Sequence, residues 1–190
     1  MNKYRPFQRF MIGLTLTEML VCLSIMVILM TLALPGFSQM IETQKLKTTV
    51  TEFYATINLT RSEAIKRGSQ VSMVSNDGKS WKSGWRVVIR PSGNSAVGAD
   101  GNGEEIIFSH AALTGDLLIS HNFTDGSQPY ISYTGNGRSR SNTSSEQPLA
   151  GTVTFTLREK TKRIKVNFLG RARICELNSD PTCGDNQSGG

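Results

Sequence analysis

The sequence has few of the side chains on which enzymes and metal sites depend. Its 190 residues include three cysteines and two histidines. His110 and His121 lie far from any cysteine and have no ligand spacing, so a zinc site is not expected. No H-E-x-x-H or G-x-S-x-G motif occurs, and no phosphate-binding glycine loop precedes a helix. We therefore expect a protein that is not an enzyme and that binds no metal or cofactor.

Acidic residues are scarce relative to basic ones. There are 15 Asp and Glu residues against 21 Lys and Arg residues, which gives a formal net charge of +6. This excess indicates an anionic partner, although a solvated basic face gives the same value. Outside its apolar N-terminal part the chain has about 150 residues, enough for one domain with its own core and too few for two.

Long apolar runs are also rare, and the only one starts close to the N-terminus. From Leu14 to Ala33 it covers about 20 residues, roughly 30 Å of helix, which is enough to cross a bilayer. Glu18 is the one charge inside it, and a carboxylate in such a run indicates a function because it is costly there. Lys3, Arg5 and Arg9 precede the run and predict a cytoplasmic N-terminus and an exported C-terminal domain.

The junction in front of this run reads Gly13-Leu14-Thr15-Leu16-Thr17-Glu18. This order resembles the class III leader of type IV pilins and pseudopilins, although that family usually has Phe where Leu14 stands. A cleaved secretory signal would place small residues of A-x-A type after the run, where this chain has LALPGFSQM. The resemblance implies that a prepilin peptidase cleaves after Gly13 and N-methylates Leu14.

Glu18 would then be the fifth residue of the mature chain. Its carboxylate would neutralise the free N-terminal amine of a neighbouring subunit in a filament, since two buried charges are tolerated only as a pair. Alternatively, Glu18 extends to the membrane interface and has no partner.

Residues 38–67 contain neither Gly nor Pro and continue the helix. An apolar stripe at spacings of three, four and seven residues predicts a face that packs on a domain, and Gly68 follows as a helix terminator. The members of the stripe are Leu46, Val50, Phe53, Ile57 and Ala64. After Gly68 the period changes to two, which predicts seven strands. They lie at 70–75, 84–90, 104–109, 116–121, 129–134, 151–157 and 162–168.

These patterns predict an α+β fold. A long N-terminal helix, whose first half spans a membrane, packs on an antiparallel β-sandwich as in pilins. The segment Arg61-Ser62-Glu63-Ala64-Ile65-Lys66-Arg67 resembles the helix end of FimT/GspH-type pseudopilins, and we expect its charged side chains to form a solvated, ion-paired face. The expected parts are a leader (1–13), a membrane and assembly helix (14–37), its amphipathic continuation (38–68), a β-rich domain (69–175) and a C-terminal loop and tail (176–190).

The last third of the chain is strongly basic. Residues 158–173 contain seven cations and one acid, Glu159. Alternation in the predicted strand places Ile164, Val166 and Phe168 inward and Arg163, Lys165 and Asn167 outward.

The strand leads into Gly170-Arg171-Ala172-Arg173, which resembles the GRxR segment of DNA-uptake members of the FimT family. That resemblance implies that Arg171 and Arg173 bind DNA. Charge alone adds a second GRxR segment, Gly137 to Arg140, and the nearby strand cations. The complete predicted DNA-binding set is Arg171, Arg173, Lys165, Arg163, Lys162, Arg138 and Arg140.

Contacts of this basic segment would be to phosphates, because no aromatic run lies beside it for base stacking. Alternatively, the cations only keep the edge of an exported sheet soluble.

The cysteines divide into two kinds. Cys175 and Cys183 bracket a short loop near the C-terminus, and in an exported domain such a pair is expected to form a disulfide. The bond would stabilise the fold by roughly 2–3 kcal/mol in the chain-entropy treatment. Cys22 lies in the apolar run and is expected to be an inert small hydrophobe.

Two functions follow from these expectations. The first is a minor type IV pilin that is incorporated in a pilus and binds extracellular DNA without sequence preference during natural transformation. The alternative is a GspH-like pseudopilin of a type II secretion system, or a pilus-assembly minor pilin, with a purely structural role. The expected partners are other pilin subunits, the prepilin peptidase, DNA and, before assembly, the inner membrane. The C-terminal domain would face the periplasm and later the filament surface.

Overall fold

The protein was analysed as a computed structural model that describes residues 13, 15–89, 104–126, 128–142, 147–175 and 183. The chain divides into two compact units, Met1–Ile41 and Glu42–Gly190, and each is described by itself. The expected new N-terminus at Leu14 lies outside the described residues, as does the expected tail apart from Cys183.

One helix, α1 (Leu16–Arg67), begins in the first unit and ends in the second. Thr15 caps its N-terminus, because the Thr15 hydroxyl accepts a hydrogen bond from the backbone N–H of Glu18 at 3.3 Å. The Thr15-x-x-Glu18 order is that of a capping box, and a carboxylate in the first turn interacts favourably with the helix dipole. Glu18 therefore also has a local role in starting the helix.

The apolar side chains of α1 between Leu16 and Met30 are exposed within their unit. The membrane span expected over 14–37 is not confirmed, since the search of the described residues yields no helix with both the length and the hydrophobicity that crossing a membrane requires.

The second part of α1 is half-buried in the globular unit, as the apolar stripe predicts. All five stripe residues are at most 2% exposed: Leu46, Val50, Phe53, Ile57 and Ala64. The helix stops at Gly68, whose φ of +62° turns the chain so that the N–H of Ser69 donates to the carbonyl of Ala64 at 3.3 Å.

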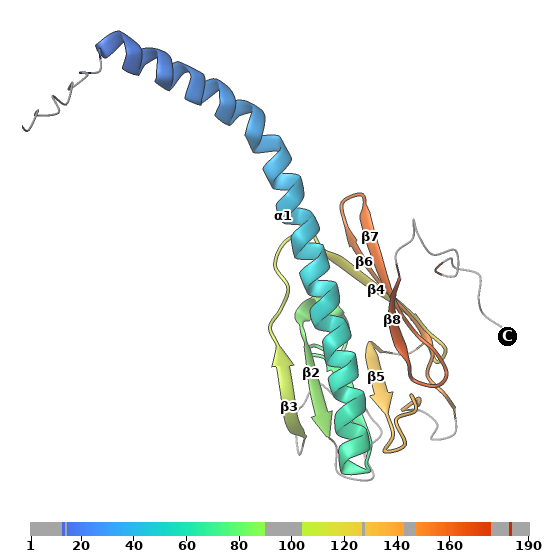
Figure 1. Cartoon of the computed structure of the whole chain (residues 1–190). Coiled ribbons are helices and arrows are strands. Elements are labelled where there is room, and N and C mark those ends of the chain that lie inside the picture. The colour runs from blue at the N-terminus through green and yellow to red at the C-terminus, as the bar shows by residue number, and fades with distance from the viewer. Residues whose placement is uncertain are drawn as a thin grey trace, which may run out of the picture. The chain divides into compact units, whose positions relative to one another are not determined.

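The globular unit also contains two antiparallel four-stranded sheets, drawn in Figure 1. The first has the order β3-β2-β1-β5, and its strands are β1 (Val71–Ser75), β2 (Trp85–Ile89), β3 (Glu105–His110) and β5 (Tyr130–Tyr133). The second has the order β4-β6-β7-β8, with β4 (Leu118–Phe123), β6 (Gly151–Leu157), β7 (Lys160–Val166) and β8 (Ala172–Cys175). A short 3₁₀ helix, η1 (Trp81–Ser83), precedes β2.

The seven predicted strands correspond to β1 through β7. Strand β8 was not predicted, because the last predicted strand ends at residue 168.

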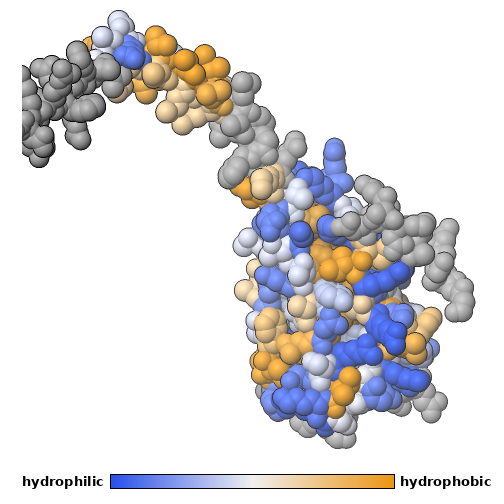
Figure 2. All heavy atoms as spheres, viewed as in Figure 1, coloured by the Kyte–Doolittle hydropathy of each residue, from blue (hydrophilic) through white to orange (hydrophobic). Residues whose placement is uncertain are grey.

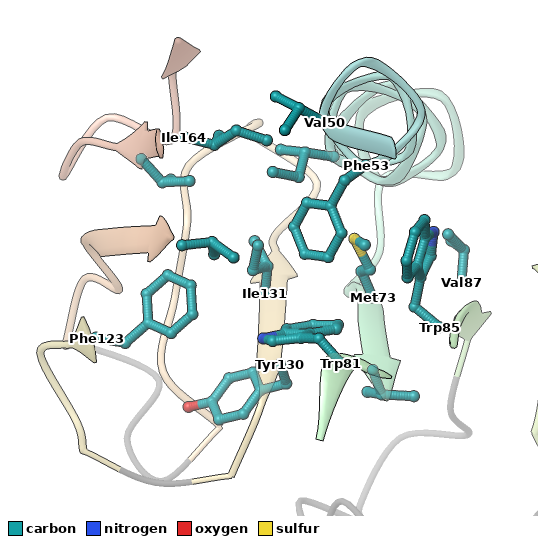
Figure 3. Close-up of a cluster of buried hydrophobic side chains, with 14 of the residues drawn as sticks. Val50, Phe53, Met73, Trp81, Trp85, Val87, Phe123, Tyr130, Ile131 and Ile164 are labelled. Carbon is teal, nitrogen blue, oxygen red and sulfur yellow. The ribbon is translucent and has the colours of Figure 1, made fainter. Parts of the chain in front are cut away.

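Phe53 joins the helix to both sheets. Its ring meets Trp85 of β2 edge to face at 5.0 Å between centroids and meets Phe155 of β6 at 5.2 Å. A third edge contact, at 5.0 Å, is to Trp81 of η1. Figure 3 shows the Phe53 ring extending from the helix among the labelled side chains of the core. The predicted α+β class, a long helix packed on antiparallel sheets, is confirmed.

Replacing Phe53 by Ala is expected to destabilise the globular unit by about 3–5 kcal/mol, because the change removes a buried ring and leaves a cavity between the helix and both sheets. Urea unfolding of the full chain in non-ionic detergent, followed by tryptophan fluorescence, measures the loss. Phe108→Ala is the matched control, since Phe108 is 37% exposed at the edge strand β3. Equal losses for the two variants would contradict the central role of Phe53.

Candidate functional site

The hairpin of β7 and β8 presents a row of cations on one face. Lys165 pairs directly with Arg173, and the ladder continues to Asn167, whose N–H donates to the carbonyl of Arg171 at 3.1 Å. Side chains alternate along a strand, and Val166 is buried beneath the sheet, so the neighbouring pairs lie on the outer face. We call Lys165, Arg171 and Arg173 the basic hairpin face.

This arrangement sets two cations side by side. Lys165 and Arg173 occupy directly opposite positions of an antiparallel ladder, where like charges repel. Neither Lys160–Cys175 nor Tyr130–Asn142 contains an Asp or Glu residue. Both segments therefore carry positive charge only.

Asn167 fixes the turn that connects the two strands. Its side-chain oxygen accepts hydrogen bonds from the N–H groups of Leu169 at 3.1 Å and Arg171 at 2.9 Å. Its carbonyl accepts the N–H of Gly170 at 2.8 Å. Gly170 has a φ of +74°, a conformation that other residues adopt only with strain. The backbone in front of Arg171 is therefore held in one conformation.

The two GRxR segments, far apart in the sequence, lie against each other. The Ser139 hydroxyl donates to the carbonyl of Asn167 at 3.3 Å, and an isolated bridge joins Ser139 to Tyr133 of β5. A Cβ added to Gly170 would lie 2.8 Å from the Ser139 nitrogen and 2.9 Å from the Gly137 oxygen. The contact was not predicted, because the second segment was included on charge alone.

Two side chains clamp the Gly170 carbonyl. The Tyr133 hydroxyl donates to it at 2.9 Å, and Nη1 of Arg61 on α1 donates to it at 3.3 Å. Burial raises the pKa of the Tyr133 phenol well above its usual range, so Tyr133 remains a protonated donor. Arg61 was expected on a solvated face, but in the structure its side chain contacts the hairpin turn. The only sequence signal for this contact was that Arg61 belongs to the helix-end segment that resembles FimT/GspH-type pseudopilins.

The rest of that helix-end segment is ion-paired as expected. Nε of Arg67 lies 2.9 Å from Glu63, and Nη1 lies 3.0 Å from Glu105 of β3. The hydrogen bond from Arg67 holds the pKa of Glu63 below its ordinary value. Ile65 packs beside the second GRxR segment, since a Cβ on Gly137 would lie 2.7 Å from its Cδ1. One end of α1 thus supports both loops.

The structure separates two predicted residues from the basic hairpin face. Lys162 lies on the same side of β7 as Ile164 and Val166, which is the buried side. Arg163 lies on the outer side, but its Nη1 donates to the carbonyl of Cys183 at 3.2 Å. Arg163 therefore binds the backbone at Cys183.

A disulfide joins Cys183 to Cys175 in β8, with 5.6 Å between the Cα atoms. The bond lies at the end of the hairpin opposite the turn, because Cys175 pairs with Arg163.

Arg138 and Arg140 flank the buried Ser139 and so extend to the other side of their segment. Arg138 is exposed and Arg140 is half-buried. On the face seen in Figure 2, strongly hydrophilic residues gather over the area where Figure 1 draws β8 and the end of β5.

The sequence reading was wrong about Phe168. Alternation through the end of the predicted strand placed this ring inward, but β7 ends at Val166 and the ring is 53% exposed in the turn. Within the described residues, no cluster of His, Cys, Asp and Glu side chains could hold a metal ion.

Comparisons with known proteins agree with this architecture. Residues 49–170 match the model of the family described as type II transport protein GspH. The type IV minor pilin FimU of Pseudomonas aeruginosa superposes with a TM-score of 0.52 at 16% identity, over 71% of this chain and 91% of that one.

The minor pseudopilin EpsH of the Vibrio cholerae type 2 secretion system gives a TM-score of 0.48 at 12% identity, over 68% of this chain and 94% of that one. No curated protein matches the sequence.

Substituting Lys165 by Thr is expected to stabilise the fold by about 0.2–1 kcal/mol, because it removes the like-charge pair with Arg173. Thr already occupies the paired position 152 of β6 on this face. The gain should shrink as salt is added, since salt screens the repulsion. Thermal unfolding at low and high salt measures both effects. A loss of stability at low salt would contradict the electrostatic account.

Replacing Gly170 by Ala is expected to disrupt the turn. The change adds about 1–2 kcal/mol of backbone strain and a further 1–3 kcal/mol from the crowded Cβ. Gly126→Ala is the control, because Gly126 has a φ of +59° but nothing within 4 Å of an added Cβ. Unfolding free energies of the two variants separate crowding from strain, and equal values would refute the close contact of the two loops.

Proposed function

The chain belongs to the GspH family of type II transport proteins, and on that premise we propose that it is a minor subunit of a type IV pilus-like filament that binds DNA. The basic hairpin face would contact the phosphate backbone without reading the base sequence. The observation that supports this most strongly is the directly opposed pair Lys165 and Arg173, with Arg171 next on the same face. A phosphate lying between these two side chains would contact two positive charges at once.

The two GRxR segments would act as one surface. Contact between Ser139 and Asn167 places Arg138 and Arg140 on a loop adjoining the turn that carries Arg171. Binding through a few cations would be weak for one subunit and strongly dependent on salt, with a Kd on the order of 10⁻⁴–10⁻⁶ M. Weak contacts suit a filament that takes up DNA and releases it.

We propose a separate role for the N-terminal part in storage and assembly. Its exposed apolar side chains would lie in the inner membrane before assembly, with the globular unit in the periplasm, and would then pack against other subunits. Cleavage after Gly13 would free the amine of Leu14, which the Glu18 carboxylate of a neighbouring subunit would neutralise. Glu18 is exposed in the isolated chain, which is compatible with such a contact.

The alternative is a purely structural pseudopilin of a secretion system, which the family description itself supports. The two functions differ in whether the basic hairpin face needs to bind a polyanion.

DNA binding tests the proposal. The full chain in non-ionic detergent is titrated against a fluorescent duplex of random sequence at two salt concentrations. Five phosphate contacts, from the basic hairpin face together with Arg138 and Arg140, predict a slope of about −4.5 in log K against log salt, so fourfold more salt should weaken binding roughly 500-fold. Arg171→Gln with Arg173→Gln should reduce the magnitude of the slope, to about −2.7, and weaken binding at low salt.

The control is Lys66→Gln with Lys79→Gln, which removes two exposed positive charges outside the hairpin. It should keep the wild-type slope. Equal effects of both double variants would mean that net charge alone attracts DNA. If the wild-type chain does not bind DNA, the purely structural role in a filament remains as its function.

A further inference from the structure

The turn of the β7–β8 hairpin exposes two apolar side chains beside the basic hairpin face. Phe168 is 53% exposed and Leu169 is 51% exposed. The ladder ends at the Asn167–Arg171 pair, so neither side chain has a sheet to pack beneath. An exposed phenylalanine next to an arginine has no role in the core.

The turn that carries Phe168 is fixed on both sides of the ring. Asn167, just before it, accepts two backbone N–H groups, and Gly170, two residues after it, is clamped by Tyr133 and Arg61. A ring presented by a fixed backbone loses little conformational entropy when a ligand covers it. The arrangement is therefore suited to contact.

We propose that Phe168 is a stacking surface for an unpaired base of single-stranded DNA whose phosphates lie along the basic hairpin face. This proposal rests on the DNA binding proposed above. Every base has a flat π-face, so stacking adds affinity without sequence preference. Bases in a duplex are stacked on each other and are not available to the ring. Phe168 should therefore add affinity for single-stranded DNA and none for a duplex.

The distribution of charge favours a nucleic acid over a lipid surface. The cations follow the hairpin away from its tip, with Arg171 beside the turn and the Lys165–Arg173 pair further along the same face. A polyanionic strand with one end stacked on Phe168 would pass along this row. A membrane would contact the tip, and its headgroups would not extend along the sheet face.

Phe168→Leu tests the proposal, because leucine keeps an apolar side chain and removes the ring. The full chain in non-ionic detergent is titrated against fluorescent oligo(dT) and against a duplex of the same length. The variant should bind oligo(dT) about tenfold more weakly and the duplex as well as wild type does. Phe108→Leu is the matched control, since it removes another exposed ring, on β3, and should change neither affinity.

Three outcomes overturn the proposal. If Phe168→Leu binds oligo(dT) as tightly as wild type does, the ring does not stack, while DNA binding by the arginines stands. If both affinities fall equally, the ring only supports the fold of the turn. If the wild-type chain binds vesicles of equal parts phosphatidylglycerol and phosphatidylcholine but not oligo(dT), the tip contacts membranes. Failure to bind either DNA would refute the proposed function itself.

Discussion

The packing of Phe53 between two sheets fixes the position of the helix, and the helix in turn positions the two arginine-bearing loops. The ring contacts Trp85 in one sheet and Phe155 in the other. These contacts fix both the rotation of α1 about its axis and its position along that axis relative to the sheets. About two turns further along, Arg61 reaches the Gly170 carbonyl, and one turn later Ile65 packs against Gly137. The same helix that closes the core therefore sets the position of both arginine-bearing loops.

Most of the fold could be predicted from the sequence, because burial imposes periods that single residues reveal. The helical stripe and the alternating strands led to the correct class and to β1 through β7. The errors arose where the strand period stops. In the sequence, Phe168 continues the inward alternation of Ile164 and Val166. The strand, however, ends at Val166, and side chains in a turn do not alternate between two faces, so Phe168 is exposed. The strand β8 was missed for the related reason that Gly170 ends one strand and introduces the next.

The site was harder to predict than the fold, because its contacts are distant in sequence. Arg61 and Gly170 are 109 residues apart, and no local pattern relates a helical arginine to a hairpin turn. The two GRxR segments share a motif, but only tertiary packing brings Ser139 against Asn167. Charge grouped cations that the fold does not place on one face, since Lys162 lies on the buried side of β7 and Arg163 donates to the carbonyl of Cys183. The composition of a segment gives its number of cations but does not tell in which direction their side chains point.

The fold itself does not require cations on the outer face of the second sheet. Strand β6 places Thr152 beside Lys165 and Thr154 beside Arg163 on that face, so neutral β-branched residues pack there readily. Solubility of the edge would be served by charges of either sign, and alternating signs would avoid repulsion. The chain instead sets Lys165 opposite Arg173 and has no acid between Lys160 and Cys175. Packing therefore does not explain the choice of Lys165 and Arg173 at these positions, and solubility does not explain why both charges are positive.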